Sequence, residues 1–138
     1  MKKIVCFILL ALTLSHAQEF NAPMKTYMES LRAEAKAKDP SFSGFDAARG
    51  EALFNGVHVG KKGKEISCTT CHETNLKKGG QNVNTNKPIT ALAPSVNPTR
   101  LTDVAEVEKW LRRNFNDVFA REGVALEKGD VLTYIMNQ

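Results

Sequence analysis

Apolar residues recur along this chain at the three- and four-residue spacing of helices that bury one face. One apolar stripe follows Pro23, and a second helical segment runs from Phe45 to about Phe54. Another stripe follows Asp103, and the last lies on a helix that begins at about Glu127. The stripes are Met24, Tyr27, Met28, Leu31 and Ala35; Val104, Val107, Leu111, Asn114 and Val118; and Val131, Tyr134 and Ile135. No alternating pattern of any length predicts a strand. The chain is therefore expected to be all-α, with about four helices in one domain.

Residues that favour helix starts support these boundaries. Pro23 suits the first position of a helix, where its missing N–H costs nothing. Ser43 with Asp46 resembles a capping box for the second helix, and Asp103 with Glu106 offers an N-terminal cap for the third. The predicted helices thus begin at residues that can satisfy their free backbone N–H groups.

The first 17 residues are predicted to be a cleaved signal peptide. A short basic start is followed by an apolar stretch, Ile4 to Leu14, that is too short to span a bilayer. Small residues at 15 and 17 suit signal peptidase, so cleavage is expected after Ala17. The alternative is an N-terminal membrane anchor. Cys6 leaves with the signal, and the mature chain, starting at Gln18, keeps two cysteines.

Both remaining cysteines belong to one motif, Cys68-Thr69-Thr70-Cys71-His72. C-x-x-C-H is the attachment sequence of a c-type haem: the two thiols form thioethers with the vinyl groups, and the histidine lies under the iron as a ligand. Two other uses of these thiols stay open. A thiol–disulfide oxidoreductase would favour a βαβ context, which is missing, and zinc would need four ligands where only remote His58 can join the three.

The sequence surrounding the motif is consistent with a haem protein. Residues 73–102 form a long irregular segment rich in Gly, Asn and Pro, which is expected to wrap the haem. The whole-chain net charge of +4 falls to +2 without the signal lysines, so nucleic acid is not indicated. Lys61, Lys62 and Lys64 form a basic run before the motif. A solvated loop is the preferred interpretation, and a docking patch for an acidic redox partner is the alternative.

The second axial ligand of the iron is not obvious from the sequence. No methionine lies between His72 and Ile135, and Met136 is close to the end of the chain. His58 precedes the motif by only ten residues. Asn114 stands on an apolar stripe, where a solvated amide would be out of place, so it either ends the helix as a polar residue or has another task such as ligation.

Several sequence blocks resemble the sphaeroides haem protein group of monohaem cytochromes c. They are Ala48–Phe54, Cys68–His72, Leu92–Ser95, Pro98, Arg100, Thr102–Asp103, Val107–Leu111, Arg113–Asn114, Asn116, Val118, Glu127–Lys128 and Asp130. The resemblance implies a class I-like helical cytochrome c fold. We expect residues 18–44 to form an N-terminal helix and linker and residues 45–138 to form the cytochrome c domain. The signal peptide and the single C-x-x-C-H motif together predict an exported, periplasmic bacterial protein with one covalent haem c.

The same resemblance implies His72 as the proximal ligand and Asn114 as the sixth. The family's asparagine is a weak ligand that leaves on reduction, which opens the iron to dioxygen or nitric oxide. A neutral amide oxygen is a hard donor that suits ferric iron better than ferrous iron. Family members are paired with a dihaem cytochrome c and a membrane cytochrome b, the expected redox partners. If the chain is an enzyme at all, the haem does the chemistry.

The chain departs from this family beside the proposed ligand. Family members have a cysteine next to the asparagine, bridged to a second one eight residues later, where this chain has Phe115 and Gly123. That disulfide is therefore absent, and Phe115 is expected to pack against the haem instead.

Three further expectations concern residues around the haem. Trp110 is either a core residue or a haem contact whose indole N–H reaches a propionate, and Arg100 either pairs with a propionate or lies in an exposed loop. Tyr134 is expected to face Gly50 and Phe54, where the first and last helices of a cytochrome c cross; a glycine at that crossing permits close approach. Electron transfer with a labile Asn114 is the leading interpretation, and a plain shuttle with a fixed sixth ligand is the alternative.

Overall fold

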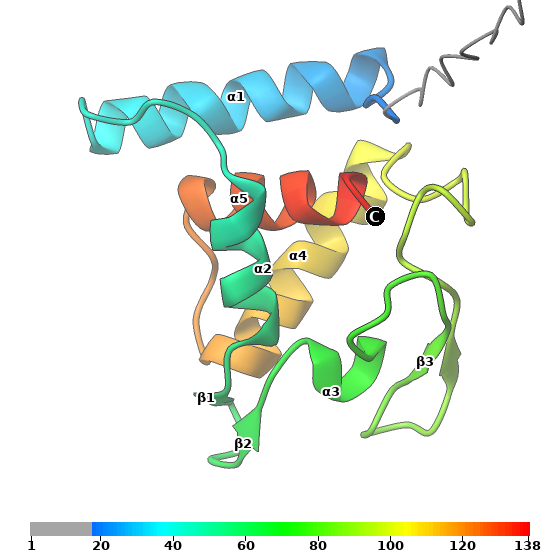
Figure 1. Cartoon of the computed structure of the whole chain (residues 1–138). Coiled ribbons are helices and arrows are strands. Elements are labelled where there is room, and N and C mark those ends of the chain that lie inside the picture. Colours follow the sequence, from blue (N-terminus) through cyan, green and yellow to red (C-terminus); the bar gives the residue numbers. More distant parts are fainter. Residues whose placement is uncertain (1–17) are drawn as a thin grey trace, which may run out of the picture.

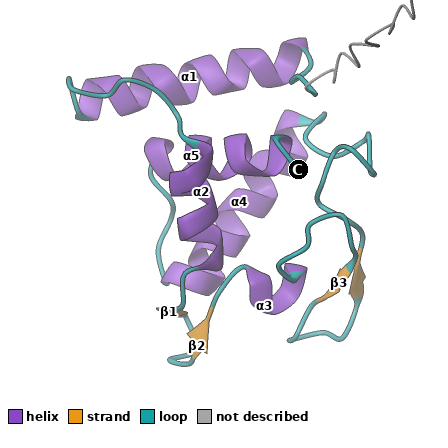
Figure 2. Cartoon of the chain, viewed as in Figure 1, coloured by secondary structure: helices purple, strands orange, loops and turns teal. Residues whose placement is uncertain are grey.

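The computed structural model describes residues 18–138; the predicted signal peptide lies outside the described residues. Within that range the chain is mainly helical (Figures 1 and 2). The helices are α1 (Ala22–Lys38), α2 (Ala47–Asn55), α3 (Thr69–His72), α4 (Val104–Phe119) and α5 (Ala125–Met136). The strands are β1 (His58–Val59), β2 (Glu65–Ile66), β3 (Gly80–Gln81) and β4 (Pro88–Ile89). None of the described helices is long and apolar enough to cross a membrane.

The observed helix starts agree with the sequence-based predictions for α1 and α4 and differ for α2. Pro23 is the second residue of α1, one position after the predicted one but still in the first turn. The Asp103 carboxylate accepts the Glu106 backbone N–H at the start of α4, as predicted. The predicted capping box at Ser43 is wrong. Asp46 itself caps α2 by accepting the Arg49 N–H at 2.7 Å, so the helix begins at residue 47 rather than 45.

The crossing of α2 and α5 is the centre of the core, as Figure 1 shows. A Cβ built on Gly50 would lie 2.1 Å from the Asp130 carbonyl oxygen and 2.9 Å from Tyr134 Cβ. The Phe54 and Tyr134 rings lie 5.6 Å apart between centroids. These contacts confirm the prediction that Tyr134 faces Gly50 and Phe54. Only a residue without a side chain at position 50 permits so close an approach of the two helices.

An ion pair between half-exposed Arg49 and buried Asp130 reinforces the same crossing. Asp130 is 3 % exposed and accepts two hydrogen bonds from Arg49, Nε to Oδ2 at 2.8 Å and Nη2 to Oδ1 at 2.9 Å. Its Oδ1 also accepts the Asp46 N–H at 2.7 Å. The carboxylate therefore has three donors, which is what a buried charge requires.

Helix α1, at the top of Figure 1, packs against α5. Its buried residues are Met24, Met28, Leu31 and Ala35, and Met24 is 0 % exposed. The stripe predicted for this helix is thus its packing face. The boundary between residues 44 and 45 stays a prediction.

Two short hairpins flank α3. Strand β1 pairs antiparallel with β2, and β3 pairs with β4. Each strand has two residues, too short for an alternating pattern to reveal. The segment after the motif is anchored at Leu76, 1 % exposed, whose carbonyl accepts the N–H groups of Leu92 and Ala93 at 3.0 and 2.9 Å. This closure turns the long irregular segment into an ordered loop.

Candidate haem site

The five residues of the motif form a single helical turn. Cys68 precedes α3, and Cys71 and His72 follow three and four residues later, so all three lie on neighbouring positions of one turn. Buried Ser67 holds this turn: its backbone N–H donates to Thr70 Oγ1 at 3.0 Å, and its hydroxyl lies 2.6 Å from Thr69 Oγ1. The two threonines inside the motif thereby fix its start.

Backbone and aromatic groups pack behind this turn. A Cβ on Gly80 would lie 1.9 Å from the Cys71 carbonyl oxygen and 3.0 Å from His72 Cα, so β3 fits against the motif only as glycine. The His72 ring lies 6.0 Å from the Phe54 ring. The motif is therefore coupled directly to helix α2. Sequence reasoning missed Ser67 and Gly80, whose roles depend on tertiary contacts.

The Cys68 thiol differs from the reactive thiol of a redox catalyst. Cys68 and Cys71 are both free and half-buried. Burial, with the neighbouring Cys71 second, raises the pKa of Cys68 to about 12, so this thiol is protonated at neutral pH. A thiol–disulfide catalyst needs a lowered pKa instead. Among residues 18–138 no three His, Cys, Asp or Glu side chains gather as a metal site, so the zinc alternative has no ligand set there.

His72 is suited to ligate iron. Burial, and then the positive charge of Arg100, lowers its pKa to about 4, so the imidazole is neutral at pH 7. In the described part of the chain its ring takes part in no hydrogen bond. Two free thiols and a neutral imidazole on one helical turn are the donor set that a covalent haem requires, so the residues present fit the group.

Asn114 lies on the inward side of α4, close to buried Leu111 and Val118. It is half-buried, and its amide makes no hydrogen bond within residues 18–138. No hydrogen bond joins it to His72, which is on a different helix. An unused, partly buried amide is available for another partner.

The places of the absent disulfide are filled by packing. Phe115 is 4 % exposed and stacks on Phe119 with 5.2 Å between ring centroids. A Cβ on Gly123 would lie 2.7 Å from Phe115 Cδ1, so the phenyl ring rests directly on this glycine. The expectation that Phe115 packs against the haem is wrong, because almost none of its surface remains free.

Arg100 lies near the motif, and Trp110 lies at the surface. Arg100 donates from Nε to the Ala91 carbonyl at 3.0 Å and from Nη2 to the Thr90 carbonyl at 3.0 Å, which fixes its half-buried guanidinium. Trp110 is 44 % exposed and donates its indole N–H to Glu106 Oε2 at 3.0 Å. The interpretation of Trp110 as a core residue is therefore wrong, and a haem contact for either residue stays a prediction.

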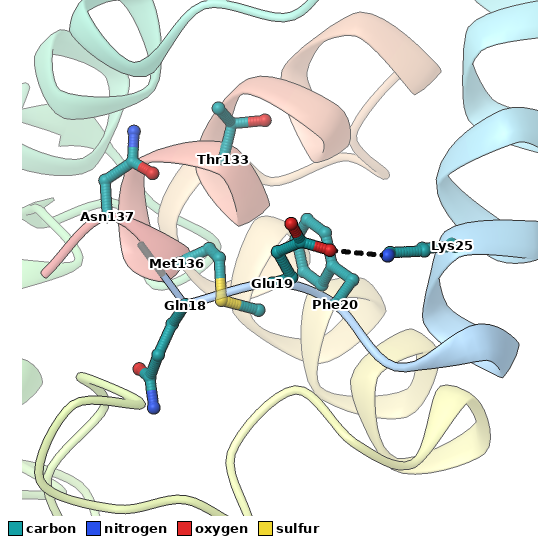
Figure 3. Close-up of a pocket in the computed structure, with 7 residues that line it drawn as sticks. All are labelled: Gln18, Glu19, Phe20, Lys25, Thr133, Met136 and Asn137. Carbon is teal, nitrogen blue, oxygen red and sulfur yellow. Dashed lines mark hydrogen bonds and ion pairs between the residues drawn. The ribbon is translucent and has the colours of Figure 1, made fainter. Parts of the chain in front are cut away.

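The two other candidates for the sixth ligand lie in different surroundings. The His58 ring packs on Phe119 with 4.3 Å between centroids, and its Nε2 is buried without a hydrogen-bond partner in the described structure. Met136 lines a surface pocket of about 250 Å³ with Gln18 and Phe20 (Figure 3). No residue of the motif lines that pocket, so Met136 belongs to the contact with the N-terminal segment.

The helical fold and this motif turn define a c-type haem protein. A family profile described as "Domain of unknown function (DUF1924)" matches residues 40–135. Cytochrome c-type protein SHP of Cereibacter sphaeroides is 46% identical over 105 residues, 76% of this chain and 78% of that protein. Cytochrome c'' of Methylophilus methylotrophus is 31% identical over 104 residues, 75% and 72% of the two chains. The chain belongs to the family of these two c-type cytochromes.

Solved structures of the same two proteins share the fold. Oxidized SHP, described as an oxygen binding cytochrome c, superposes with a TM-score of 0.72 and 40% identity, covering 83% of this chain and 96% of that one. Oxidized cytochrome c'' superposes with a TM-score of 0.74 and 28% identity, covering 83% and 94%. The predicted family and the all-α class are confirmed. The relationship implies a covalently bound haem c and redox partners.

Proposed function

We propose that this protein is a periplasmic monohaem cytochrome c in which Asn114 is a labile sixth ligand. His72 holds the iron from the proximal side, and Asn114 coordinates it in the ferric state. Asn114 leaves on reduction, which gives a diatomic ligand such as dioxygen or nitric oxide access to ferrous iron. One haem is proposed because the sequence holds a single C-x-x-C-H. The haem supplies the one-electron redox chemistry.

The observation that carries this proposal is the state of Asn114. Its amide is half-buried on the packing face of α4 and has no hydrogen-bond partner among the described residues. A neutral amide oxygen binds ferric iron better than ferrous iron, so reduction weakens the bond. Two relatives support the idea: one is described as an oxygen binding cytochrome c, and a solution structure of the other concerns haem-ligand detachment.

A basic residue, Arg100, and an aromatic residue, Trp110, are proposed to complete the site. Arg100 uses Nε and Nη2 for carbonyl groups, and its Nη1 makes no hydrogen bond in the described part of the chain, so it can pair with a propionate. Trp110 is exposed enough to contact a haem edge. Arg100→Gln is expected to lower the reduction potential, because it removes a positive charge that stabilises the ferrous state. Arg100→Lys keeps the charge and should retain most of the wild-type potential.

The proposed electron donors are a dihaem cytochrome c and a membrane cytochrome b. Export to the periplasm follows from the predicted signal peptide, and mass spectrometry of the purified protein tests it. A mature chain starting at Gln18 with one covalent haem is expected. Retention of residues 1–17 would contradict the export proposal.

Optical and EPR spectra of the haem-loaded protein test the Asn114 ligand. Wild type is expected to be low-spin when ferric, and high-spin and able to bind nitric oxide when ferrous. Asn114→Ala should make the ferric state high-spin. Asn116→Ala is the matched control, because Asn116 is also half-buried and lies two residues further along α4; its spectra should equal those of wild type.

A plain electron shuttle is the second candidate, and the unpartnered Nε2 of His58 favours it. In that case the ferrous protein stays low-spin, ignores nitric oxide and is unaffected by Asn114→Ala. His58→Ala would then change both spectra.

A further inference from the structure

The positive charge of this protein is concentrated around the haem motif. Residues 57–90, here called the lysine segment, contain six lysines and two glutamates, a net charge of +4. The other described residues contain eleven basic and thirteen acidic side chains, a net charge of −2. The small overall charge therefore conceals a strong separation of charge. The six lysines are Lys61, Lys62, Lys64, Lys77, Lys78 and Lys87.

The lysines of this segment differ from the other basic residues in their pairing. All six are exposed, and within residues 18–138 none forms an ion pair with a carboxylate. The ion pairs of the described structure use cations elsewhere, such as Arg49 with Asp130 and Arg121 with Glu127. A solvated face of random composition would mix both signs. This segment instead presents positive charge that no acidic side chain nearby neutralises.

The lysine segment surrounds the residues that attach the haem. Strand β2 leads through Ser67 into Cys68, and Gly80 of β3 packs on the Cys71 carbonyl. Figure 1 shows the two hairpins next to α3. The Lys62 Nζ donates to Asn84 Oδ1 at 2.5 Å, which joins the turn of one hairpin to the turn of the other. The lysines therefore lie on and next to the two hairpins that flank the haem attachment turn.

Exposed apolar side chains lie on the same hairpins. Val57 is 63% exposed, Val59 66% and Val83 50%. Interfaces combine apolar contact with a polar rim, and the rim charges determine which partner is attracted and how fast. Valines beside unpaired lysines at a redox centre have the composition of such a surface.

We propose that the lysine segment is the docking surface for an acidic redox protein, which passes one electron to the ferric haem or takes one from the ferrous haem. The partner presents Asp and Glu to the lysines and a small apolar patch to the valines. This inference rests on the electron-transfer part of the proposed function and is independent of Asn114. It favours the docking alternative for residues 61–64 over the interpretation as a solvated loop.

Stopped-flow reduction of the ferric, haem-loaded protein by an acidic flavodoxin hydroquinone tests this surface. Lys61→Gln/Lys64→Gln removes two charges from the segment. Lys36→Gln/Lys38→Gln is the matched control, because both residues are exposed and unpaired at the end of α1, outside the segment. At low ionic strength the first variant should react about three- to tenfold more slowly than wild type, and the control should react within about 1.5-fold of it. The difference should vanish at about 0.5 M salt.

Equal rates for the two variants would overturn the docking surface, as would a difference that salt does not remove. Sedimentation with vesicles of anionic phospholipid provides the second arm. Binding that needs Lys61 and Lys64, with the flavodoxin rate unchanged, would assign the segment to a membrane surface and also overturn the proposal. Dithionite separates the two proposals: a haem that it cannot reduce contradicts electron transfer itself, whereas normal reduction by dithionite leaves only docking in question.

Discussion

Replacing Gly123 with alanine tests the contact that occupies the place of a disulfide. The new Cβ would lie 2.7 Å from both Cδ1 and Cε1 of Phe115, closer than carbon atoms approach in folded proteins. The phenyl ring cannot tilt freely, because it is 4 % exposed and stacks on Phe119 at 5.2 Å. The strain must therefore move the ring, the loop or the end of α4.

The size of the effect follows from two opposing terms. Overpacking a close-packed site costs about 1–3 kcal/mol. Alanine also stabilises the protein by about 0.4–1 kcal/mol, because it reduces the conformational entropy of the unfolded chain. This gain applies here since the backbone of Gly123 lies outside the left-handed region and suits alanine. A net loss of about 1–2 kcal/mol is expected, which corresponds to a Tm lower by about 5 °C for a domain of this size.

The functional consequence comes from the neighbouring residue. Asn114 directly precedes Phe115, so a displaced ring shifts the turn of α4 that carries the proposed ligand. Urea denaturation of the haem-loaded protein measures the stability, and the ferric Soret band measures ligation. Both the lower stability and a larger high-spin fraction are expected in Gly123→Ala. Val124→Ala is the control, because that side chain is 56% exposed and its loss should change little.

A double mutant supplies the refutation. Phe115→Leu alone leaves space beside Gly123, and the alanine methyl group fills part of that space in the double variant. The two changes should therefore couple favourably, by about 0.5 kcal/mol or more. Additive effects, or a Gly123→Ala protein as stable as wild type, would show that the Phe115–Gly123 contact does not hold the end of α4.

Three further predictions concern the helix contacts. Arg49→Ala should cost about 1–3 kcal/mol in urea unfolding, because the buried Asp130 carboxylate loses two of its three hydrogen bonds while the half-exposed guanidinium leaves a site that water can enter; an effect below about 0.5 kcal/mol would contradict this. Gly50→Ala should prevent close packing of α2 on α5 and yield little folded holo-protein in expression trials, since the obstacle is backbone. Arg121 lowers the pKa of Glu127 in the folded protein. Their ion pair therefore stabilises the fold above the unfolded pKa of about 4.3, and this stability is lost as the pH falls through the lower folded pKa. Thermal melts from pH 7 to pH 3 should show a smaller pH dependence in Glu127→Gln than in wild type.

The features that the sequence predicted correctly depend on few residues or on regular spacing. The helix at Val104–Phe119 follows from its apolar stripe and the Asp103 cap, and the α2–α5 crossing follows from Gly50 and Tyr134. The haem motif is local, because five consecutive residues carry both the attachment and the proximal ligand. Local patterns of this kind can be recognised without knowledge of the tertiary contacts.

The errors arose where the partner of one aromatic side chain decides the outcome. Trp110 stands at the edge of its stripe, and the acceptor one turn back, Glu106, holds the indole at the surface. Phe115 turned to Gly123 rather than to the haem, because a glycine eight residues later leaves room for a ring. The apolar stripe alone identifies neither partner.

In the part of the chain that the structure describes, charged side chains are paired in the helical core and unpaired in the lysine segment. In the described helices, carboxylates and cations are brought together: Asp130 is enclosed by the helix crossing, and Glu127 fixes the start of α5. In the lysine segment the cations have no such partners, although two glutamates, Glu65 and Glu73, stand among them in the sequence. Unpaired charges repel each other and reduce the stability of the folded chain. Their concentration beside the haem attachment turn is therefore better explained by attraction to an acidic partner than by folding.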